Sequence, residues 1–175
     1  MAERILVIGS PGSGKSSLAR ILAERTGLPL HHLDQLYWQP SWVEPDKAEW
    51  QARVAALSAE PRWIIDGNYS ETLAPRLARA ELVVLLDLAP LRCTWRILKR
   101  TLRDHGKVRA DVAAGCPERF NLGFLWYVIS FRLLRLPRTQ AKLAGYTGEL
   151  VWLGTPREVA RYLASGERPG EDGQE

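Results

Sequence analysis

The chain has 175 residues, of which 46% are hydrophobic and 25% are charged, a composition typical of one soluble globular domain. Its two cysteines, Cys93 and Cys116, are too few for a disulfide framework, and no apolar run reaches the roughly 18 residues of a membrane span. The first residues lack the pattern of a signal peptide. We therefore exclude the disulfide-rich and membrane-spanning classes and expect a cytoplasmic protein with free thiols and no membrane partner.

The net charge of +4 is unevenly distributed along the chain. Residues 88–142 contain twelve Lys or Arg against three Asp or Glu, which leaves a net charge of −5 for the rest. A basic sector of this kind attracts anions, and both nucleotides and nucleic acids are candidates.

Short apolar segments alternate with segments of helical periodicity. In chain order we expect strands at 4–8, 30–33, 63–65, 82–86 and 149–153, and helices at 16–26, 45–58, 70–79, 91–104, 118–135 and 156–164. Strands separated by helices favour a parallel sheet with a helical layer on each face. We expect one α/β domain over residues 1–165 and a disordered polar tail over residues 166–175.

The first strand is followed by the stretch "GSPGSGKSS", which fits the phosphate-loop pattern G-x-x-x-x-G-K-[ST]. Such a loop aims backbone N–H groups and a helix N-terminus at one phosphate. Lys15 would contact the β- and γ-phosphates, and the Ser16 hydroxyl would bind Mg²⁺. No N-K-x-D motif of GTP-binding proteins is present, so we predict a small ATP-dependent phosphotransferase.

The second strand ends at Asp34, in "LHHLDQLYW". A carboxylate there could bind or deprotonate an acceptor hydroxyl, although a helix N-cap or a surface acid is the alternative. His31 and His32 have no ligand cluster beside them, so we interpret them as packing or hydrogen-bonding residues. Four aromatic residues nearby either stack on a substrate ring or belong to the core: Tyr37, Trp38, Trp42 and Trp50.

Two further strands end in an acid, Asp66 and Asp87. We favour Asp66 as the residue that organises Mg²⁺ with Ser16, because the third strand is expected beside the phosphate-loop strand. For Asp87 we favour a cap of the following helix.

The helix expected at 91–104 carries Arg92, Arg96, Arg100 and Arg103 along one stripe, and the segment 104–118 after it lacks periodicity. We interpret this segment as a lid that delivers Arg109 and Arg119 and excludes water, with a solvated basic face as the alternative.

The apolar stretch "FNLGFLWYVISF" predicts a buried helix over 118–135, whose basic end reaches the phosphates. Attachment of this helix to a membrane surface is the alternative.

The chain resembles the adenylate-kinase-like P-loop kinases, and among them the bacterial group labelled "DNA topology modulation protein". The resemblance rests on "GSPGSGKSSLA", "LHHLDQLYWQPSW", "WIIDGNYSETL", "LLDLAPLRCTWRILKR", "GCPERF" and "VWLGTPREVARYL". It implies a three-layer fold, with a five-stranded parallel sheet in the order 2-3-1-4-5, helices on both faces and a helical lid.

The resemblance also implies site residues. ATP would be held by Gly9, Ser10, Pro11, Gly12, Ser13, Gly14, Lys15, Ser16 and Ser17, with Arg96, Thr155 and Pro156 near adenine. Mg²⁺ would be held by Ser16 and Asp66, and catalysis would involve Lys15, Asp34, Arg96, Arg100 and Arg109.

The chain departs from adenylate kinases in lacking a Pro-Arg after "DG" and the T-G-D/E-x-x-R monophosphate motif. At Asp34 it is more similar to gluconate- and shikimate-type kinases, whose acceptors are small hydroxyl compounds. We expect a small-molecule or nucleotide acceptor and a monomer or homodimer. A DNA-binding or DNA-topology-modulating ATPase is the alternative, supported by the basic sector.

Overall fold

A computed structural model describes residues 2–165 of the chain. The predicted tail over residues 166–175 lies outside this range. Within it, no helix combines the length and the apolar character needed to cross a membrane.

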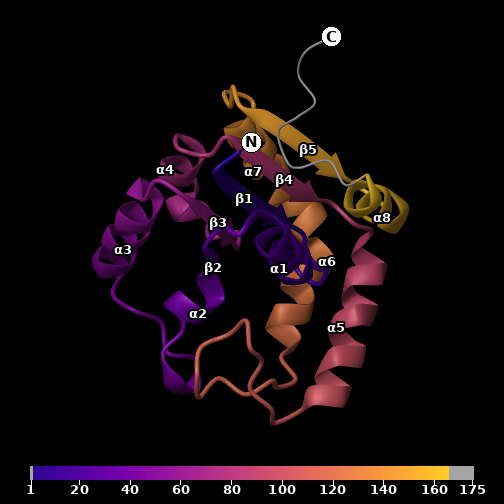
Figure 1. Cartoon of the computed structure of the whole chain (residues 1–175). Coiled ribbons are helices and arrows are strands. Elements are labelled where there is room, and N and C mark those ends of the chain that lie inside the picture. Colours follow the sequence, from indigo (N-terminus) through magenta and orange to yellow (C-terminus); the bar gives the residue numbers. More distant parts are fainter. Residues whose placement is uncertain (1, 166–175) are drawn as a thin grey trace.

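The centre of the molecule is a parallel sheet of five strands in the order β2-β3-β1-β4-β5 (Figure 1). The strands are β1 (Arg4–Gly9), β2 (Leu30–His32), β3 (Trp63–Asp66), β4 (Leu82–Leu86) and β5 (Glu149–Leu153). The three-layer α/β fold and its strand order are thus as predicted. In the register, Val7 of β1 is paired with Asp66 of β3. The phosphate-loop strand and the strand that ends in Asp66 are therefore neighbours.

Helices cover both faces of the sheet. One core contains apolar residues of α1 (Lys15–Thr26), α5 (Pro90–Asp104) and α8 (Pro156–Ala164). The other contains residues of α3 (Lys47–Ala59), α4 (Leu73–Leu77) and α7 (Leu136–Leu143). Strand residues 5, 7, 82, 84 and 86 face the first core, and residues 6, 8, 83 and 85 face the second. This alternation follows from the two-residue period of a strand.

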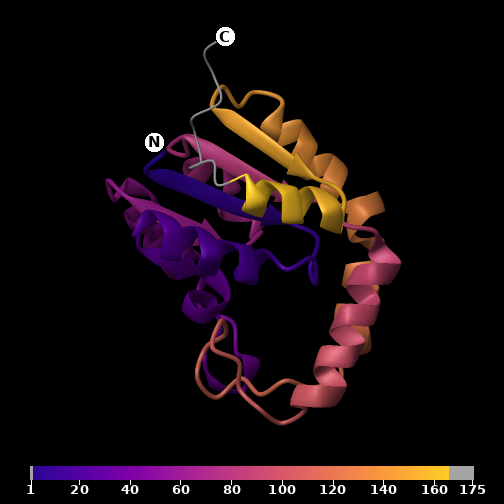
Figure 2. The same ribbon diagram turned by 45° about the vertical axis from the view of Figure 1, so that its right-hand side comes forward.

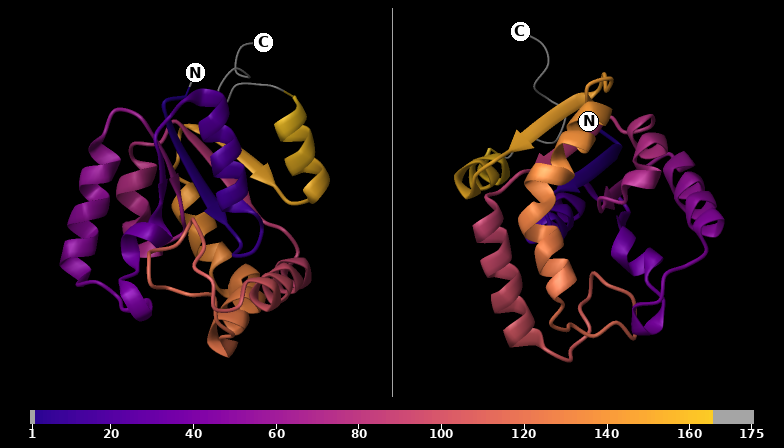
Figure 3. Two further views of the ribbon diagram at one scale, coloured as in Figure 1. Left: turned by 60° about the horizontal axis from the view of Figure 1, so that its bottom comes forward. Right: turned by 180° about the vertical axis from the view of Figure 1, so that it is seen from behind.

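The predicted buried helix over 118–135 is wrong in its start and in its burial. The observed α6 (Leu122–Leu134) buries Val128 and Phe131, but Trp126 and Leu133 on its other side are 66% and 80% exposed. The arginines at its basic end have partners within the protein. Arg132 forms an ion pair with Asp87 at 3.3 Å, and Arg135 lies over the ring of Tyr127. Figure 3 shows α6 and α7 running across the back of the sheet.

Residues 105–121, between α5 and α6, include most of the segment 104–118 that was predicted as a lid, and we call them the lid below. They contain turns and an isolated bridge but no helix. No helix lies within this segment, and the helices α5 and α6 flank its two ends. Figure 2 shows this segment running from the foot of α5 towards α2 (Leu33–Tyr37). The lid is thus a loop that bridges two parts of the molecule.

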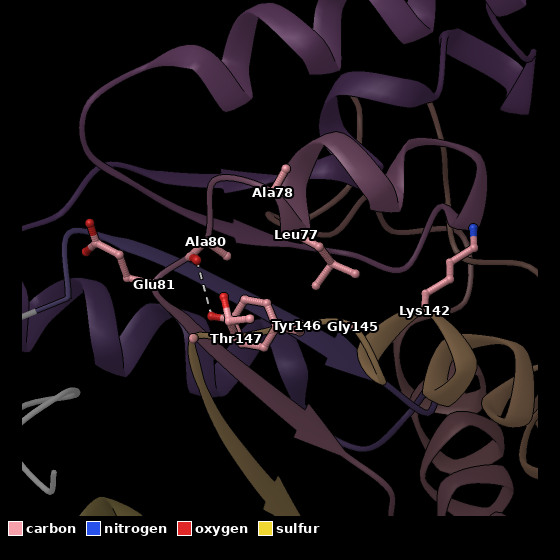
Figure 4. Close-up of a pocket in the computed structure, with 9 residues that line it drawn as sticks. Leu77, Ala78, Ala80, Glu81, Lys142, Gly145, Tyr146 and Thr147 are labelled. Carbon is pink, nitrogen blue, oxygen red and sulfur yellow. Dashed lines mark hydrogen bonds between the residues drawn. The ribbon is translucent and has the colours of Figure 1, made fainter.

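The pocket drawn in Figure 4 lies away from the phosphate loop. Its volume is about 450 Å³, and Glu81 and Gly148, which precede β4 and β5, are among its lining residues. Tyr146 donates a hydrogen bond to the carbonyl oxygen of Ala80 at 3.2 Å within it. In a parallel α/β sheet, ligands bind outside the opposite, carboxyl ends of the strands. We therefore build the candidate site at that other edge.

The loop after β3 is held by a buried arginine, Arg76 of α4, whose side chain has no exposed surface. Its guanidinium group donates hydrogen bonds to the backbone carbonyl oxygens of Gly67 at 2.7 Å, Asn68 at 2.5 Å, Tyr69 at 2.8 Å and Thr72 at 3.0 Å. Burial lowers the pKa of Arg76 to about 9. The group is nevertheless charged at neutral pH, so these carbonyl dipoles compensate a buried cation.

We predict that Arg76→Met lowers the free energy of unfolding by about 3 kcal/mol, because several buried carbonyl groups lose their donor together. Urea denaturation measures this change. Arg79→Met is the matched control: its side chain is exposed, and we expect a change within about 0.5 kcal/mol. Equal effects of the two substitutions would contradict the structural role of Arg76.

Candidate active site

The loop between β1 and α1 has the backbone of a phosphate-binding loop. Gly9, Gly12 and Gly14 have φ values of 129°, 78° and 103°, in the region that favours glycine. At Gly9 there is also no space, because a Cβ atom would lie 2.1 Å from the carbonyl oxygen of Leu86. The helix that follows begins at Lys15. The loop therefore turns back on β1 and directs the N-terminus of α1 towards the edge of the sheet.

Lys15 folds over this loop. Its Nζ donates a hydrogen bond to the carbonyl oxygen of Ser10 at 2.9 Å. Burial lowers the pKa of Lys15, and the negative charges of Asp66 and Asp34 oppose this shift. The ammonium group thus lies at the loop and interacts electrostatically with two carboxylates, Asp66 at the end of β3 and Asp34 in the first turn of α2.

Asp66, at the end of β3, has one oxygen engaged and one free for a ligand. Its Oδ2 is 2.8 Å from Nδ1 of His32, while Oδ1 is buried and has no hydrogen-bond partner among residues 2–165. An orphaned carboxylate oxygen beside the Ser16 loop fits the oxygen donors that Mg²⁺ prefers. No group of three or more His, Cys, Asp or Glu in the described part of the chain could hold a metal by itself.

The two other interpretations at the strand ends have different outcomes. His32 is a hydrogen-bonding residue as expected, and His31 lies 3.7 Å from Glu60 on the other side of the strand. Asp87 does not cap α5, whose N-cap residue is Ala89 without a side-chain cap. Its carboxylate faces Arg132 instead, because α6 passes that end of β4.

Asp34 lies in the first turn of α2 and is neither its N-cap nor a surface acid. The N-cap residue is His32, and the hydroxyl group of Tyr69 donates a hydrogen bond to Oδ1 of Asp34 at 2.7 Å. Burial raises the pKa of Asp34, opposed by this hydrogen bond and by the charges of Lys15 and Arg109. A carboxylate with a raised pKa in this position is suited to accept a proton.

The loop over residues 67–72, in which the sequence analysis named no site residue, connects these parts. Asn68 forms two hydrogen bonds of 2.9 Å with the backbone of Gly9: its Oδ1 accepts from N–H, and its Nδ2 donates to the carbonyl oxygen. The next residue, Tyr69, is the partner of Asp34 and has a φ of 32°. Backbone strain at a non-glycine residue next to such contacts is typical of functional sites. The sequence signals for this loop were the break after "WIID" and the place of "WIIDGNYSETL" in the family resemblance, and neither singled out Asn68 or Tyr69.

The arginines of α5 and the lid meet at a buried acid. Glu118 accepts hydrogen bonds from Arg100 at 3.1 Å and from the Thr101 hydroxyl at 2.8 Å, and it pairs with Arg109 at 3.1 Å. Arg96 instead donates to the carbonyl oxygen of Ser13, in the phosphate loop, at 3.0 Å. Of the predicted cluster, the structure therefore brings Arg96, Arg100 and Arg109 to the site.

Arg119 is not brought there. Its guanidinium group lies over the ring of Trp42, 5.7 Å from the ring centre, at the outer end of the lid. Trp42 itself donates from Nε1 to the carbonyl oxygen of Pro117 at 3.1 Å, and the backbone N–H of Ser41 donates to Gly115 at 2.9 Å. Trp42 thus fastens the lid, whereas Trp50 is core, 4% exposed. Tyr37 and Trp38 lie between Trp42 and Trp50. The ring centres of Tyr37 and Trp38 are 4.9 Å apart.

The lid also carries an acid that the sequence did not single out, Asp111. Arg109 pairs with it at 3.3 Å. Burial alone raises the pKa of Asp111, but Arg109 and a hydrogen bond with the Ser16 side chain outweigh burial and hold the pKa below its usual value. The lid therefore reaches the serine of the phosphate loop.

The segment predicted beside adenine forms the start of α8. Thr155 is the N-cap residue, and its hydroxyl accepts a hydrogen bond from the backbone N–H of Glu158 at 3.2 Å. Glu158 in turn accepts from the N–H of Gly154 at 2.7 Å. Pro156 opens the helix. The Thr155 hydroxyl is committed to the cap, so any contact with a base falls to the backbone and to Pro156.

We predict that Gly9→Ala lowers the free energy of unfolding by about 3 kcal/mol, because the new Cβ atom would collide with the Leu86 carbonyl group. Gly27→Ala is the control. Gly27 also has a positive φ, of 68°, but nothing lies within 4 Å of an added Cβ, and we expect about 1 kcal/mol. Urea denaturation of the two variants separates backbone strain from the close approach. A cost at Gly9 no greater than at Gly27 would contradict the tight packing of the loop on β4.

No family model matches the chain, and no curated protein gives a significant sequence match. Solved structures do match over nearly the whole chain. A shikimate kinase from Acinetobacter baumannii has a TM-score of 0.58 and 17% identity, covering 92% of this chain and 88% of that one. A shikimate kinase from Bacteroides thetaiotaomicron has a TM-score of 0.53 and 12% identity, covering 94% and 96%. A gluconokinase from Sinorhizobium meliloti 1021 has a TM-score of 0.50 and 19% identity, covering 92% and 91%. At these identities the likeness shows the fold, which is that of the P-loop kinases.

Proposed function

We propose that the protein is a kinase that transfers the γ-phosphoryl group of Mg-ATP to a hydroxyl group of a small acceptor. The observation that carries the proposal is the partly buried Asp34, which interacts electrostatically with Lys15 of the phosphate loop and accepts a hydrogen bond from Tyr69. A loop for phosphates alone would suit many ATP-binding proteins. A proton-accepting carboxylate opposite that loop is what transfer to a hydroxyl group requires.

The residues have separate tasks in this proposal. The backbone of Gly9–Ser17 and the Lys15 ammonium group bind the triphosphate, and Ser16 and Asp66 hold Mg²⁺, which neutralises charge on the phosphate oxygens. Arg96, Arg100 and Arg109 supply further positive charge. Asp34 accepts the proton of the acceptor hydroxyl group. The hydroxyl oxygen forms a bond to the γ-phosphorus, and the bond between that phosphorus and the leaving oxygen of ADP breaks.

The solved structures support the class of acceptor. Three of the matching solved structures are named as shikimate kinases and a gluconokinase. These names and the position of Asp34 just after the second strand together favour a small hydroxyl compound over a nucleoside monophosphate as the phosphoryl acceptor. We also keep the cytoplasm as the proposed location, since ATP is available there.

The alternative, a DNA-binding ATPase of the topology modulation group, rests on the basic sector. Several arginines of that sector have partners within the protein: Arg96 binds Ser13, Arg100 and Arg109 bind Glu118, and Arg103 binds Asp104. Fewer of them are therefore available for a row of phosphate contacts along a duplex.

The proposal predicts labelled product when the protein is incubated with [γ-³²P]ATP, Mg²⁺ and a panel of hydroxy acids, sugars, nucleosides and nucleotides. Asp34→Asn should lower transfer at least about 100-fold and preserve the thermal stabilisation by Mg-ATP, whereas Lys15→Ala should abolish that stabilisation. Glu24→Gln, on the exposed side of α1, is the control. ATP hydrolysis without any labelled acceptor would favour the ATPase alternative, and no stabilisation of the wild type by Mg-ATP would overturn the proposal.

The hydrogen bond between Tyr69 and Asp34 predicts a pH effect. Asp34 acts only when ionised, so the transfer rate falls as the pH drops below its raised pKa. Tyr69→Phe removes a hydrogen bond that lowers this pKa, and the acidic limb of the rate profile should move to higher pH. Tyr37→Phe is the control, because its ring packs beside Tyr69 at 4.7 Å without bonding Asp34. An unmoved acidic limb in Tyr69→Phe would remove Asp34 as the base.

A further inference from the structure

An apolar stripe runs along the exposed side of α5. Leu91, Trp95 and Leu102 are 82%, 67% and 82% exposed, and the partly buried Leu98 completes the series. Their spacings of four, three and four residues place them on one side of a helix. A large apolar residue exposed alone is ordinary, but an aligned series of them marks an interaction surface.

The neighbouring helix α6 carries an equivalent stripe. Leu122, Trp126, Ile129 and Leu133 have the same spacings and are all exposed. Each helix thus presents one tryptophan and several aliphatic side chains to the outside.

The two stripes belong to one outer face. On α5, Ile97 is buried in the core and Arg96 faces the phosphate loop. On α6, Val128 is buried in the same core, and the flank that carries Tyr127 faces inwards. In both helices the stripe occupies the remaining side. The helices α5 and α6 pack side by side, as Figure 3 also shows. From this packing and from the position of each stripe on its helix, we infer that the two stripes belong to one outer face, turned away from the candidate active site.

This face is basic at its edges. Arg92 and Lys99 are exposed on α5 beside the stripe. The three acids of residues 88–142 are Asp104, Asp111 and Glu118, and each is paired with an arginine in or beside the lid. The excess of positive charge in this sector is therefore not offset by acids of its own.

We propose that the outer face of α5 and α6 docks on an anionic lipid surface. Helices that lie in a membrane interface combine leucine and tryptophan on one side with lysine and arginine along the edges, as α5 does. The apolar stripes would enter the boundary between headgroups and acyl chains, and the basic residues would meet the phosphates. A second copy of the chain fits less well, because face-to-face contact would oppose two basic sectors without carboxylates to pair them. The inference is independent of the proposed kinase activity.

The test is co-sedimentation of the full chain with vesicles of phosphatidylcholine alone and of phosphatidylcholine mixed with phosphatidylglycerol. We expect binding to the anionic vesicles, weakened by salt, and little binding to the neutral ones. Leu102→Glu combined with Leu133→Glu should lower the affinity at least about tenfold. Both residues are exposed, so folding should be unaffected, which thermal unfolding checks.

The matched control is Val43→Glu combined with Leu150→Glu, two exposed apolar residues outside the face. It adds the same charge and should leave vesicle binding unchanged. The proposal is overturned if anionic vesicles do not bind at low salt, if neutral vesicles bind equally, or if both double variants behave alike. Size-exclusion chromatography with light scattering tests whether a second copy of the chain covers this face. If the wild type is a dimer that does not bind vesicles, and the double variant at Leu102 and Leu133 is a monomer, a second copy and not a lipid surface occupies the face.

Discussion

The candidate site depends on the hydrogen bonds between the guanidinium group of Arg76 and the carbonyl groups of the loop after β3. That loop carries Asn68, which clamps Gly9 at the start of the phosphate loop, and Tyr69, which orients Asp34. One buried cation therefore supports the phosphate side and the acceptor side together. An arginine is needed because its planar group offers five donors in a fixed arrangement, whereas a lysine offers a compact charge.

The parts of the structure that sequence predicts well are those determined by local pattern or by a general topological rule. The glycines and Lys15 of the first loop follow from the backbone geometry that a phosphate demands, and the alternation of strands and helices determines the three-layer fold. We favoured Asp66 over Asp87 because the third strand was expected beside β1, and the observed register does pair Asp66 with Val7. Because β4 is the other neighbour of β1, this adjacency alone does not separate the two acids. What separates them in the structure is that Asp87 forms an ion pair with Arg132. The site roles assigned to these residues stay predictions.

Other features depend on contacts between segments distant in sequence, which no local pattern encodes. Arg76 lies in an ordinary helical segment, and only the fold shows that four carbonyl groups converge on it. Arg119 was expected at the phosphates because it lies close to Arg109 in the sequence, but the lid directs it to Trp42. The burial of α6 was inferred from its apolar content alone. Its periodicity contains a second apolar side, and nothing in a single sequence tells which side the core occupies.

Electrostatics explains why the site is suited to a ligand that carries its own cation. Lys15, Arg96, Arg100 and Arg109 are matched in number by Asp34, Asp66, Asp111 and Glu118. A site of this balance has no excess of positive charge for a bare triphosphate, whose own charge would lie beside the carboxylates of Asp34 and Asp66. With Mg²⁺ bound to the phosphates, the same carboxylates change from a repulsive to an attractive contribution, because the ion is the largest local charge. In the proposed function, Mg²⁺ would supply the partner that the orphaned oxygen of Asp66 lacks, and the raised pKa of Asp34 would serve proton transfer.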